Sequence, residues 1–376
     1  MRVMVAFGTR PEAIKMAPVV HALTRHGAFS TIVVVTAQHR GLLDQALEVF
    51  SISPDHDLDV MQSDQELPDL TSRILLGMGP VIEAHRPDFL LVHGDTTTTL
   101  ASSLAAFYAK VPVGHVEAGL RTGDVLAPWP EEMNRRLTTS LSRLHFAPTE
   151  TARENLLQEG VARTDVHVTG NTVIDALLQI DRKLDEDRTL RESMERRFPF
   201  LDPGRRLLLV TGHRRENFGD RFESIFDALV RLSKRNDLQI VYTLHPNPGV
   251  SGPAKRILSG RPNIVLVEPQ DYLPFVFLMR WSAIILTDSG GIQEEAPSLG
   301  KPVLVMRDAT ERPEAIAAGT ARLVGADPDR IVDEVATLLD LPGRYDDMSR
   351  SHNPYGDGNA SDRIVSVLAE VMRQRA

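Results

Sequence analysis

The segment Asp288-Ser289-Gly290-Gly291 follows an apolar run and precedes a helical pattern. Glycines let backbone N–H groups approach a ligand closely, and the N-terminus of a helix favours negative charge. Glu294 and Glu295 follow within about one helical turn, so a carboxylate there would reach the hydroxyls of a ribose. This arrangement predicts a binding site for a nucleotide diphosphate. The alternative is an ordinary glycine turn between a strand and a helix.

Two cations and two carboxylates follow other predicted strands. Arg10 and Lys15 come after the first strand, where they would neutralise a diphosphate or else lie as solvated charges on a helix. Asp95 and Glu117 each come at the end of an apolar strand, two residues after a histidine. Neighbouring parallel strands would project both acids into one cleft, although Asp95 also suits the N-cap of the next helix. Glu117 has no such capping role.

Two further sites follow the same logic. Glu131 and Glu132 come after two prolines, where acids in the first turn of a helix are also favoured by its dipole. His213 follows a buried strand beside Arg214, and an imidazole titrates near neutrality. His213 would therefore serve as a proton carrier or a phosphate ligand, unless it is an ordinary histidine of a surface turn.

Composition narrows the class of protein. The chain has 376 residues, no cysteine and a net charge of −9, which argues against disulfides, cysteine zinc sites and nucleic-acid partners. We see no signal peptide and no apolar run long enough to cross a membrane, so we expect a cytoplasmic protein with no membrane partner. The phosphate-loop and dinucleotide motifs are missing from the sequence. The acidic segment at 55–57 resembles a metal site but is more typical of an exposed loop.

The elements that must position these residues alternate along the chain. Apolar runs predict strands at 3–7, 32–36, 89–93, 113–117, 207–211, 240–244, 264–267, 283–287 and 303–306. Amphipathic segments predict helices between them, at 12–26, 97–110, 221–234 and 331–339. Strands that are apolar on both faces and alternate with helices indicate parallel sheets covered on both sides, which bind ligands at the carboxyl ends of their strands.

The chain is long enough for two domains. The pattern Gly-x-Arg-x-Glu follows a predicted strand both at 8–12 and at 212–216, which favours two similar domains. We expect a first domain over 1–170 and a second over 171–360, with the densely charged segment 181–196 as a solvated helix or linker near the boundary. The last helix, within 361–376, is expected to pack on the first domain.

Taken together, these segments resemble the bacterial non-hydrolysing UDP-N-acetylglucosamine 2-epimerases. The segments that carry the resemblance are FGTRPEAIK (7–15), HGDTTT (93–98), GHVEAGLRTG (114–123), PEE (130–132), TGHRREN (211–217), DSGGIQEE (288–295) and RPE (312–314). They occur in order over nearly the whole chain. The resemblance implies a GT-B-like α/β fold with two Rossmann-type parallel-sheet domains and an interdomain cleft, usually in a homodimer.

The same resemblance implies interconversion of UDP-GlcNAc and UDP-ManNAc without a cofactor or metal. UDP would leave by anti elimination, a 2-acetamidoglucal would form, and UDP would add back. The implied catalytic residues are Asp95, Glu117, Glu131 and His213. The implied substrate contacts are Arg10, Lys15, Asp95, Glu117, His213, Gln270, Phe275, Ser289, Gly290, Gly291, Glu295 and Arg312.

Some relatives are activated by UDP-GlcNAc at a second site. The matching positions here are Gln38, Arg73, Arg214 and His245, although Gly41 departs from the longer polar residue of some relatives and Pro246 directly follows His245. Three other functions remain open at this stage. They are a GT-B glycosyltransferase, which would need an acceptor, a hydrolysing epimerase, which would release free ManNAc, and a non-catalytic sensor of nucleotide sugars.

Overall fold

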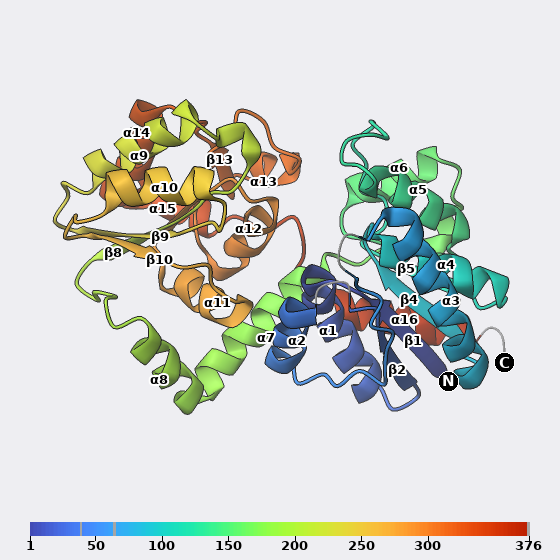
Figure 1. Ribbon diagram of the computed structural model, residues 1–376. Coiled ribbons are helices and arrows are strands. Elements are labelled where there is room, and N and C mark those ends of the chain that lie inside the picture. The colour runs from blue at the N-terminus through green and yellow to red at the C-terminus, as the bar shows by residue number, and fades with distance from the viewer. Residues whose placement is uncertain (38–39, 63–64, 374–376) are drawn as a thin grey trace. The chain divides into compact units, whose positions relative to one another are not determined.

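The computed structural model describes residues 1–37, 40–62 and 65–373. The chain divides into two compact units, one formed by Met1–Ala176 with Tyr355–Ala376 and the other by Leu177–Pro354. In Figure 1 each unit consists of a sheet with helices packed around it. The chain passes from the first unit to the second within one helix, α7 (Thr172–Glu186).

The described residues of the first unit contain a seven-stranded parallel sheet in the order β3-β2-β1-β4-β5-β6-β7. Its strands are β1 (Arg2–Phe7), β2 (Ser30–Val35), β3 (His56–Asp57), β4 (Phe89–His93), β5 (Val113–Val116), β6 (Leu144–Ala147) and β7 (Val166–Val168). Its helices are α1 (Arg10–Arg25), α2 (Arg40–Val49), α3 (Leu67–His85), α4 (Thr97–Tyr108), α5 (Glu131–Leu141), α6 (Glu150–Gln158) and α16 (Ala360–Arg373), with a 3₁₀ turn at Arg163–Asp165.

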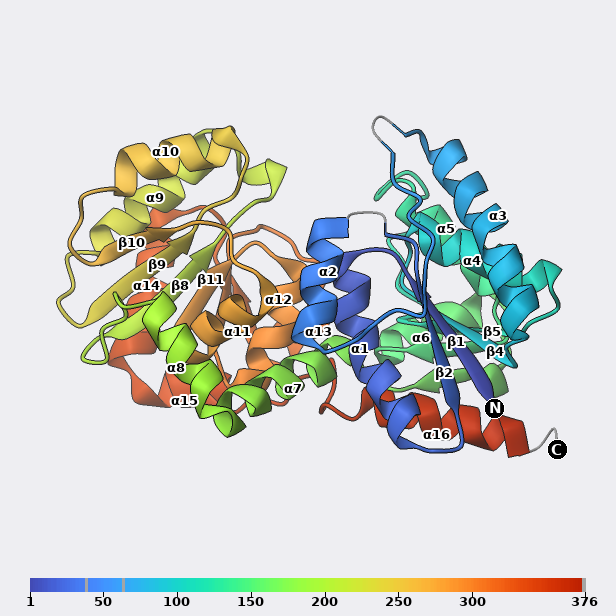
Figure 2. The same cartoon turned by 60° about the horizontal axis from the view of Figure 1, so that its bottom comes forward.

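The central strands of this sheet are apolar on both faces because helices cover both. Every residue of β4 and β5 is buried. Figure 2 shows α1 and α2 on one side of β1 and β2, with α3 and α4 on the other. The strand order reverses between β1 and β4, and ligands of open parallel sheets bind at such a reversal, beyond the carboxyl ends of the strands.

The second unit repeats this topology. Its described residues form a six-stranded parallel sheet in the order β10-β9-β8-β11-β12-β13, which reverses between β8 and β11. The strands are β8 (Arg206–Thr211), β9 (Leu238–Thr243), β10 (Ile264–Val267), β11 (Ile284–Thr287), β12 (Val303–Val305) and β13 (Ala321–Leu323). The helices are α8 (Arg188–Arg197), α9 (Asp220–Leu232), α10 (Pro248–Leu258), α11 (Tyr272–Trp281), α12 (Gly290–Glu295), α13 (Pro313–Ala317), α14 (Pro328–Asp340) and α15 (Pro342–Ser349), with 3₁₀ turns at Arg215–Asn217 and Ala296–Leu299.

Aromatic side chains fill the core of the second unit beneath α9. Phe226 stacks on Phe222 and meets Tyr242 edge to face, with ring centroids 5.6 Å apart in each pair. All three side chains are fully buried. This core supports β8 and β9 from one side, so the loop after β8 is attached to a well-packed strand.

The C-terminal segment completes the first unit. The Asp175 carboxylate accepts hydrogen bonds from the backbone N–H groups of Ala360 (3.2 Å) and Ser361 (2.7 Å), at the start of α16. Arg25 on α1 forms an ion pair with Asp362 at 3.0 Å. Helix α16 therefore packs on the first unit through α1.

The segment at 55–57 corrects one expectation. It is not simply an exposed loop, because His56 and Asp57 pair in parallel with Val34 and Val35 as the edge strand β3. Backbone pairing at a sheet edge needs no apolar side chains, so an acidic segment with little hydrophobic pattern still forms a short strand. Within the described ranges, every helix is too short or too polar to cross a membrane.

Candidate active site

In the first unit, the loop after β1 is joined to the loop after β4 by the buried carboxylate of Glu12. This carboxylate accepts hydrogen bonds from the N–H groups of Gly8 (3.0 Å) and Thr9 (2.8 Å) and from the hydroxyls of Thr96 (2.6 Å) and Thr99 (3.2 Å). Thr9 in turn caps α1 in a capping box with Glu12. The two loops at the reversal of strand order are therefore held together as one surface.

Glu117 lies at the end of β5 in an unusual backbone conformation. Its φ is +62°, in the left-handed region that a non-glycine residue rarely adopts, and only about a tenth of its side chain is exposed. Lys15 on α1 forms an ion pair with its carboxylate, and the Asn171 side chain donates a hydrogen bond to it at 2.9 Å. The Nε2 atom of His93 lies 3.7 Å from the same oxygen. Backbone strain of this kind gathers at functional sites.

These contacts determine the charge of Glu117. Burial acts most strongly and would raise the pKa of the carboxyl, but Lys15 and His93 together outweigh it and hold the pKa well below its usual range. Glu117 is therefore ionised at neutral pH. Lys15 contacts this acid and is not a solvated charge on a helix face.

Asp95 does not cap α4. The N-cap is Thr96, whose hydroxyl accepts a hydrogen bond from the Thr99 N–H group at 3.2 Å. The Asp95 carboxylate instead forms an ion pair with Arg135 of α5 at 3.2 Å and remains one-third exposed. Its pKa is raised, chiefly by burial and further by the Glu117 charge, while Arg135 acts in the opposite direction. Asp95 thus holds a proton more readily than Glu117 does.

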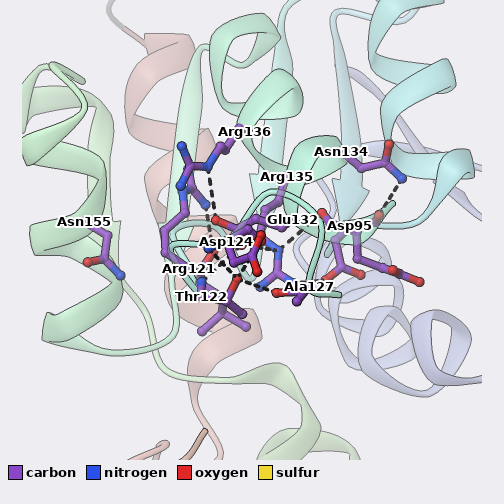
Figure 3. Close-up of polar contacts among 12 residues, drawn as sticks. Asp95, Arg121, Thr122, Asp124, Ala127, Glu132, Asn134, Arg135, Arg136 and Asn155 are labelled. Atoms are coloured by element: carbon purple, nitrogen blue, oxygen red, sulfur yellow. Dashed lines mark hydrogen bonds and ion pairs between the residues drawn. The ribbon is translucent and has the colours of Figure 1, made fainter. Parts of the chain in front are cut away.

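Glu131 and Glu132 play different parts at the start of α5. Glu131 is half-buried in the first turn. Glu132 is fully buried and accepts hydrogen bonds from the Thr122 N–H group and the Arg136 Nε atom, both at 3.1 Å. Figure 3 shows Glu132 among Thr122, Arg135 and Arg136. Glu132 therefore anchors the loop between β5 and α5, and Glu131 is the more accessible acid of the two.

Gly119 shows how closely this loop packs. Its φ is +91°, and a Cβ atom there would lie 2.2 Å from the carbonyl oxygen of Ala152 on α6. Gly123, four residues later, also has a positive φ of +86°, but apart from its own two neighbours in the chain no described residue has an atom within 4 Å of its Cβ position. The two glycines share a positive φ and differ in steric contact, so a comparison of their alanine variants distinguishes the two effects.

We expect Gly119→Ala to lower the melting temperature of the protein more than Gly123→Ala does. Both variants meet the cost of a side chain at positive φ, about 1–2 kcal/mol, but only Gly119→Ala forces the loop away from α6. Thermal unfolding followed by circular dichroism compares them. Equal melting temperatures would contradict the close contact between the loop and α6.

In the second unit, the buried carboxylate of Asp288 holds the loop after β8. It accepts hydrogen bonds from the N–H groups of His213 (3.0 Å) and Arg214 (2.9 Å) and from the Asn217 side chain (3.1 Å). In the first unit Glu12, in the first turn of α1, holds the loop that directly precedes it. The two Gly-x-Arg-x-Glu segments are thus held differently, since Glu216 forms an ion pair with Arg307 at 2.6 Å.

The ring of His213 lies against Asp288 and His245. Its Nδ1 atom is 3.3 Å from the Asp288 carboxylate, and the two imidazoles stack with centroids 5.8 Å apart. Burial lowers the pKa of His213 more than the Asp288 charge raises it. His213 is therefore neutral at pH 7, with a ring that can accept or donate a proton.

The predicted diphosphate segment forms the turn between β11 and α12. Ser289 precedes the helix, and its N–H group donates to the Thr287 hydroxyl at 3.0 Å. The Arg312 guanidinium lies 3.9 Å from the Cβ position of Gly290 and forms an ion pair with Glu294. Arg312 therefore places a cation directly beside the turn, which is the surrounding that an anionic ligand requires.

The other acid of this helix has a separate partner. Glu295 accepts a hydrogen bond from the Tyr272 hydroxyl of α11 at 2.7 Å, and burial together with this carboxylate raises the pKa of Tyr272. Phe275 lies half-buried on α11, the helix that also carries Tyr272. Gln270 lies in the preceding loop, where its carbonyl accepts hydrogen bonds from Arg197 at 3.1 and 3.2 Å.

Comparison with known proteins shows that the segments carrying these two groups of residues belong to one protein family. Residues 21–369 match the family model of UDP-N-acetylglucosamine 2-epimerase. The UDP-N-acetylglucosamine 2-epimerase of Escherichia coli K12 is 59% identical over 369 residues, which cover 98% of each chain. The chain belongs to the UDP-N-acetylglucosamine 2-epimerase family.

Solved structures of this epimerase family agree with the fold. The UDP-GlcNAc 2-epimerase of Neisseria meningitidis, crystallised with UDP-GlcNAc, matches with a TM-score of 0.89 and 52% identity over 98% of this chain and all of that one. The Methanocaldococcus jannaschii enzyme, in complex with UDP-GlcNAc and UDP, matches with a TM-score of 0.78 and 32% identity over 98% of this chain and all of that one. The predicted GT-B-like class with two Rossmann-type parallel-sheet domains is confirmed.

The residues predicted from the epimerase resemblance fall into one group in each unit. Arg10, Lys15, Asp95, Glu117 and Glu131 lie around the strand ends of the first unit. His213, Ser289, Gly290, Gly291, Glu295 and Arg312 lie around those of the second, with Gln270 and Phe275 at α11. Of the four possible allosteric residues, Gln38 lies outside the described residues. Arg73 contacts Gln62 on the surface of the first unit, whereas Arg214 pairs with Glu311 at 3.3 Å and His245 stacks on His213.

Sequence reasoning did not single out several partners that this epimerase site depends on. Asn171 and Arg135 come from distant segments, and neither occurs in a motif. His93 carried a weak signal because it lies two residues before Asp95, as His115 does before Glu117. Asp288 was recognised as part of the glycine turn, but its role in binding the His213 loop needs the pairing of β8 with β11.

Proposed function

We propose that this protein is a non-hydrolysing UDP-N-acetylglucosamine 2-epimerase that interconverts UDP-GlcNAc and UDP-ManNAc. The observation that carries the proposal is the pair Asp95 and Glu117. They follow the adjacent strands β4 and β5, next to the reversal of strand order between β1 and β4, and their pKa values are shifted in opposite directions. Inversion at a carbon needs one group that removes a proton and another that supplies one, and such pairs are recognised by environments that separate their pKa values.

The chemistry explains why a diphosphate site must accompany these acids. The C2 proton of the sugar is too weakly acidic for simple abstraction, so departure of UDP from C1 must share the work. Anti elimination of UDP would leave 2-acetamidoglucal, and UDP would add back after C2 is protonated on the opposite face. The ionised Glu117 is suited to take the proton from one epimer, and Asp95 is suited to supply it to the other face.

The second unit supplies groups that suit the leaving UDP. Arg312 and the Ser289-Gly290-Gly291 turn offer a cation and backbone N–H groups to the diphosphate, and Glu295 offers a carboxylate to ribose hydroxyls. His213 is suited to exchange a proton with a phosphate oxygen or the sugar. Arg10 and Glu131 complete the group expected in the first unit. We propose that neither a cofactor nor a metal takes part.

The proposal is tested by incubating the pure protein with UDP-GlcNAc alone in D₂O and following the sugar by NMR. We expect UDP-ManNAc to appear and both epimers to acquire deuterium at C2, because the proton returned comes from a group that exchanges with solvent. Stoichiometric free ManNAc would instead indicate a hydrolysing enzyme. Turnover only after addition of an acceptor would indicate a glycosyltransferase, and binding without any turnover would indicate a sensor.

A further inference from the structure

Helix α5 holds both the backbone and the side chain of Asp95. The Asn134 side chain donates a hydrogen bond to the Asp95 carbonyl oxygen at 2.9 Å, and Arg135, the next residue, forms the ion pair with the carboxylate. The buried His115 ring contacts the neighbouring Gly94 carbonyl oxygen at 2.6 Å. Figure 3 shows Asn134 and Arg135 both directed toward Asp95. The turn before α4 is therefore attached to α5 through the backbone and the side chain of Asp95, and to β5 through the Gly94 carbonyl.

Arg135 is itself held in place. Only 8% of the residue is exposed, and its Nε atom lies 3.5 Å from the Glu132 carboxylate and 3.3 Å from the Glu131 carbonyl oxygen. Glu132 is fully buried and also binds Arg136 and the Thr122 N–H group. A guanidinium fixed at Nε presents its terminal nitrogens in one direction, and here that direction is Asp95.

We propose that Arg135 is a positioning residue for the epimerase reaction, held by Glu132 so that its guanidinium fixes the orientation and the proton affinity of Asp95. The inference rests on the proposed function, in which Asp95 exchanges the C2 proton. Within the described residues, the titratable and charged groups that act on Asp95 besides Arg135 are Glu117, His93 and Lys15. His93 and Lys15 both lower the Asp95 pKa through their charges, and both also contact Glu117.

The test measures the proton affinity of Asp95 directly. The protein is labelled with ¹³C at aspartate carboxyl carbons, and the Asp95 resonance is identified by its loss in Asp95→Asn. In Arg135→Gln we expect the Asp95 titration midpoint to rise by about one pH unit, because an opposite charge at this distance lowers a carboxyl pKa by about that much or more. The pH profile of kcat/KM should have one limb that reports Asp95, and the apparent pKa of this limb should rise by the same amount.

Arg136→Gln is the matched control. Arg136 binds the same Glu132 carboxylate from the same helix at 3.1 Å, and its ion pair is with Glu132 rather than with Asp95. We expect it to leave the Asp95 midpoint unchanged. In Arg135→Gln, Glu132 keeps Arg136 and Thr122, so folding should survive. If it does not, Arg135→Lys, which keeps the charge, should leave the midpoint close to wild type while lowering kcat.

Several outcomes would overturn the inference. They are an unchanged Asp95 midpoint in Arg135→Gln, an equal rise in Arg136→Gln, or a Lys variant with a shifted midpoint and normal kcat. The NMR titration needs no substrate, so it separates this inference from the proposed function. Failure of the wild-type protein to exchange the C2 proton would contradict the proposed function. The Asp95 titration midpoints would still show whether Arg135 controls the proton affinity of that acid.

Discussion

Replacement of Glu117 by glutamine should slow exchange of the C2 proton by a factor on the order of 10² to 10⁴, which is typical for loss of a general base. Glutamine keeps a carbonyl oxygen that can accept hydrogen bonds from Lys15 and Asn171, so the end of β5 should retain its shape. It cannot take a proton. Deuterium incorporation into UDP-GlcNAc in D₂O measures the effect.

Glu159→Gln provides the comparison for this variant. Glu159 is also an ion-paired acid of the first unit, held by Arg121 at 2.6 Å, but it lies at the end of α6 rather than at the site. We expect near-normal exchange of the C2 proton in Glu159→Gln. In both variants UDP should raise the melting temperature as much as it does in the wild type. Exchange at more than a tenth of the wild-type rate in Glu117→Gln would remove Glu117 from the catalytic group.

Replacement of Arg312 by alanine should weaken UDP binding by about 10- to 100-fold, since a hydrogen bond to a charged group contributes about 1.5–3 kcal/mol. Arg312 lies against the Gly290 turn and is held there by the buried Glu294, so it is aimed before a ligand arrives. Isothermal titration with UDP measures the change. The kcat at saturating substrate should fall less than kcat/KM if the contact serves binding more than the reaction itself.

Arg322→Ala controls for the loss of an ion-paired arginine in the same unit. Arg322 pairs with Glu334 of α14, and 37% of its side chain is exposed, against 21% for Arg312. We expect unchanged UDP affinity in Arg322→Ala. Because alanine at 312 would leave Glu294 without this cation, Arg312→Lys should be measured too, with an intermediate affinity expected. Wild-type affinity in both 312 variants would show that UDP is held elsewhere.

Much of the fold was predictable because it depends on local pattern. Largely apolar runs such as 89–93 and 207–211, separated by amphipathic helices, are enough to indicate parallel sheets covered on both faces. Parallel sheets place their functional residues at the carboxyl ends of strands, so Glu117 could be singled out because no local role explained it. For Asp95 the sequence left two interpretations, an N-cap of the next helix or an acid of the site. The structure excludes the first, because Thr96 is the N-cap.

The partners of these residues could not be predicted because they come from distant parts of the chain. Lys15 and Glu117 are 102 residues apart, and Asn171 reaches the same carboxylate from the start of α7. Glu131 and Glu132 look equivalent in the sequence, and only the packing of α5 buries Glu132 completely and leaves Glu131 half-buried. The pattern repeated at 8–12 and 212–216 favoured two similar domains, yet different carboxylates hold the two loops, because hydrogen bonds to backbone depend on geometry rather than on the motif.

The return of the C-terminal segment to the first unit has a consequence for how the protein is made. The carbonyl oxygen of Tyr355 accepts a hydrogen bond from the Asn171 N–H group at 2.7 Å, and Asn171 holds Glu117. On the ribosome, the second unit is fully synthesised before this segment emerges. The acid at the end of β5 therefore gains this support only after the whole second unit, Leu177–Pro354, has been made.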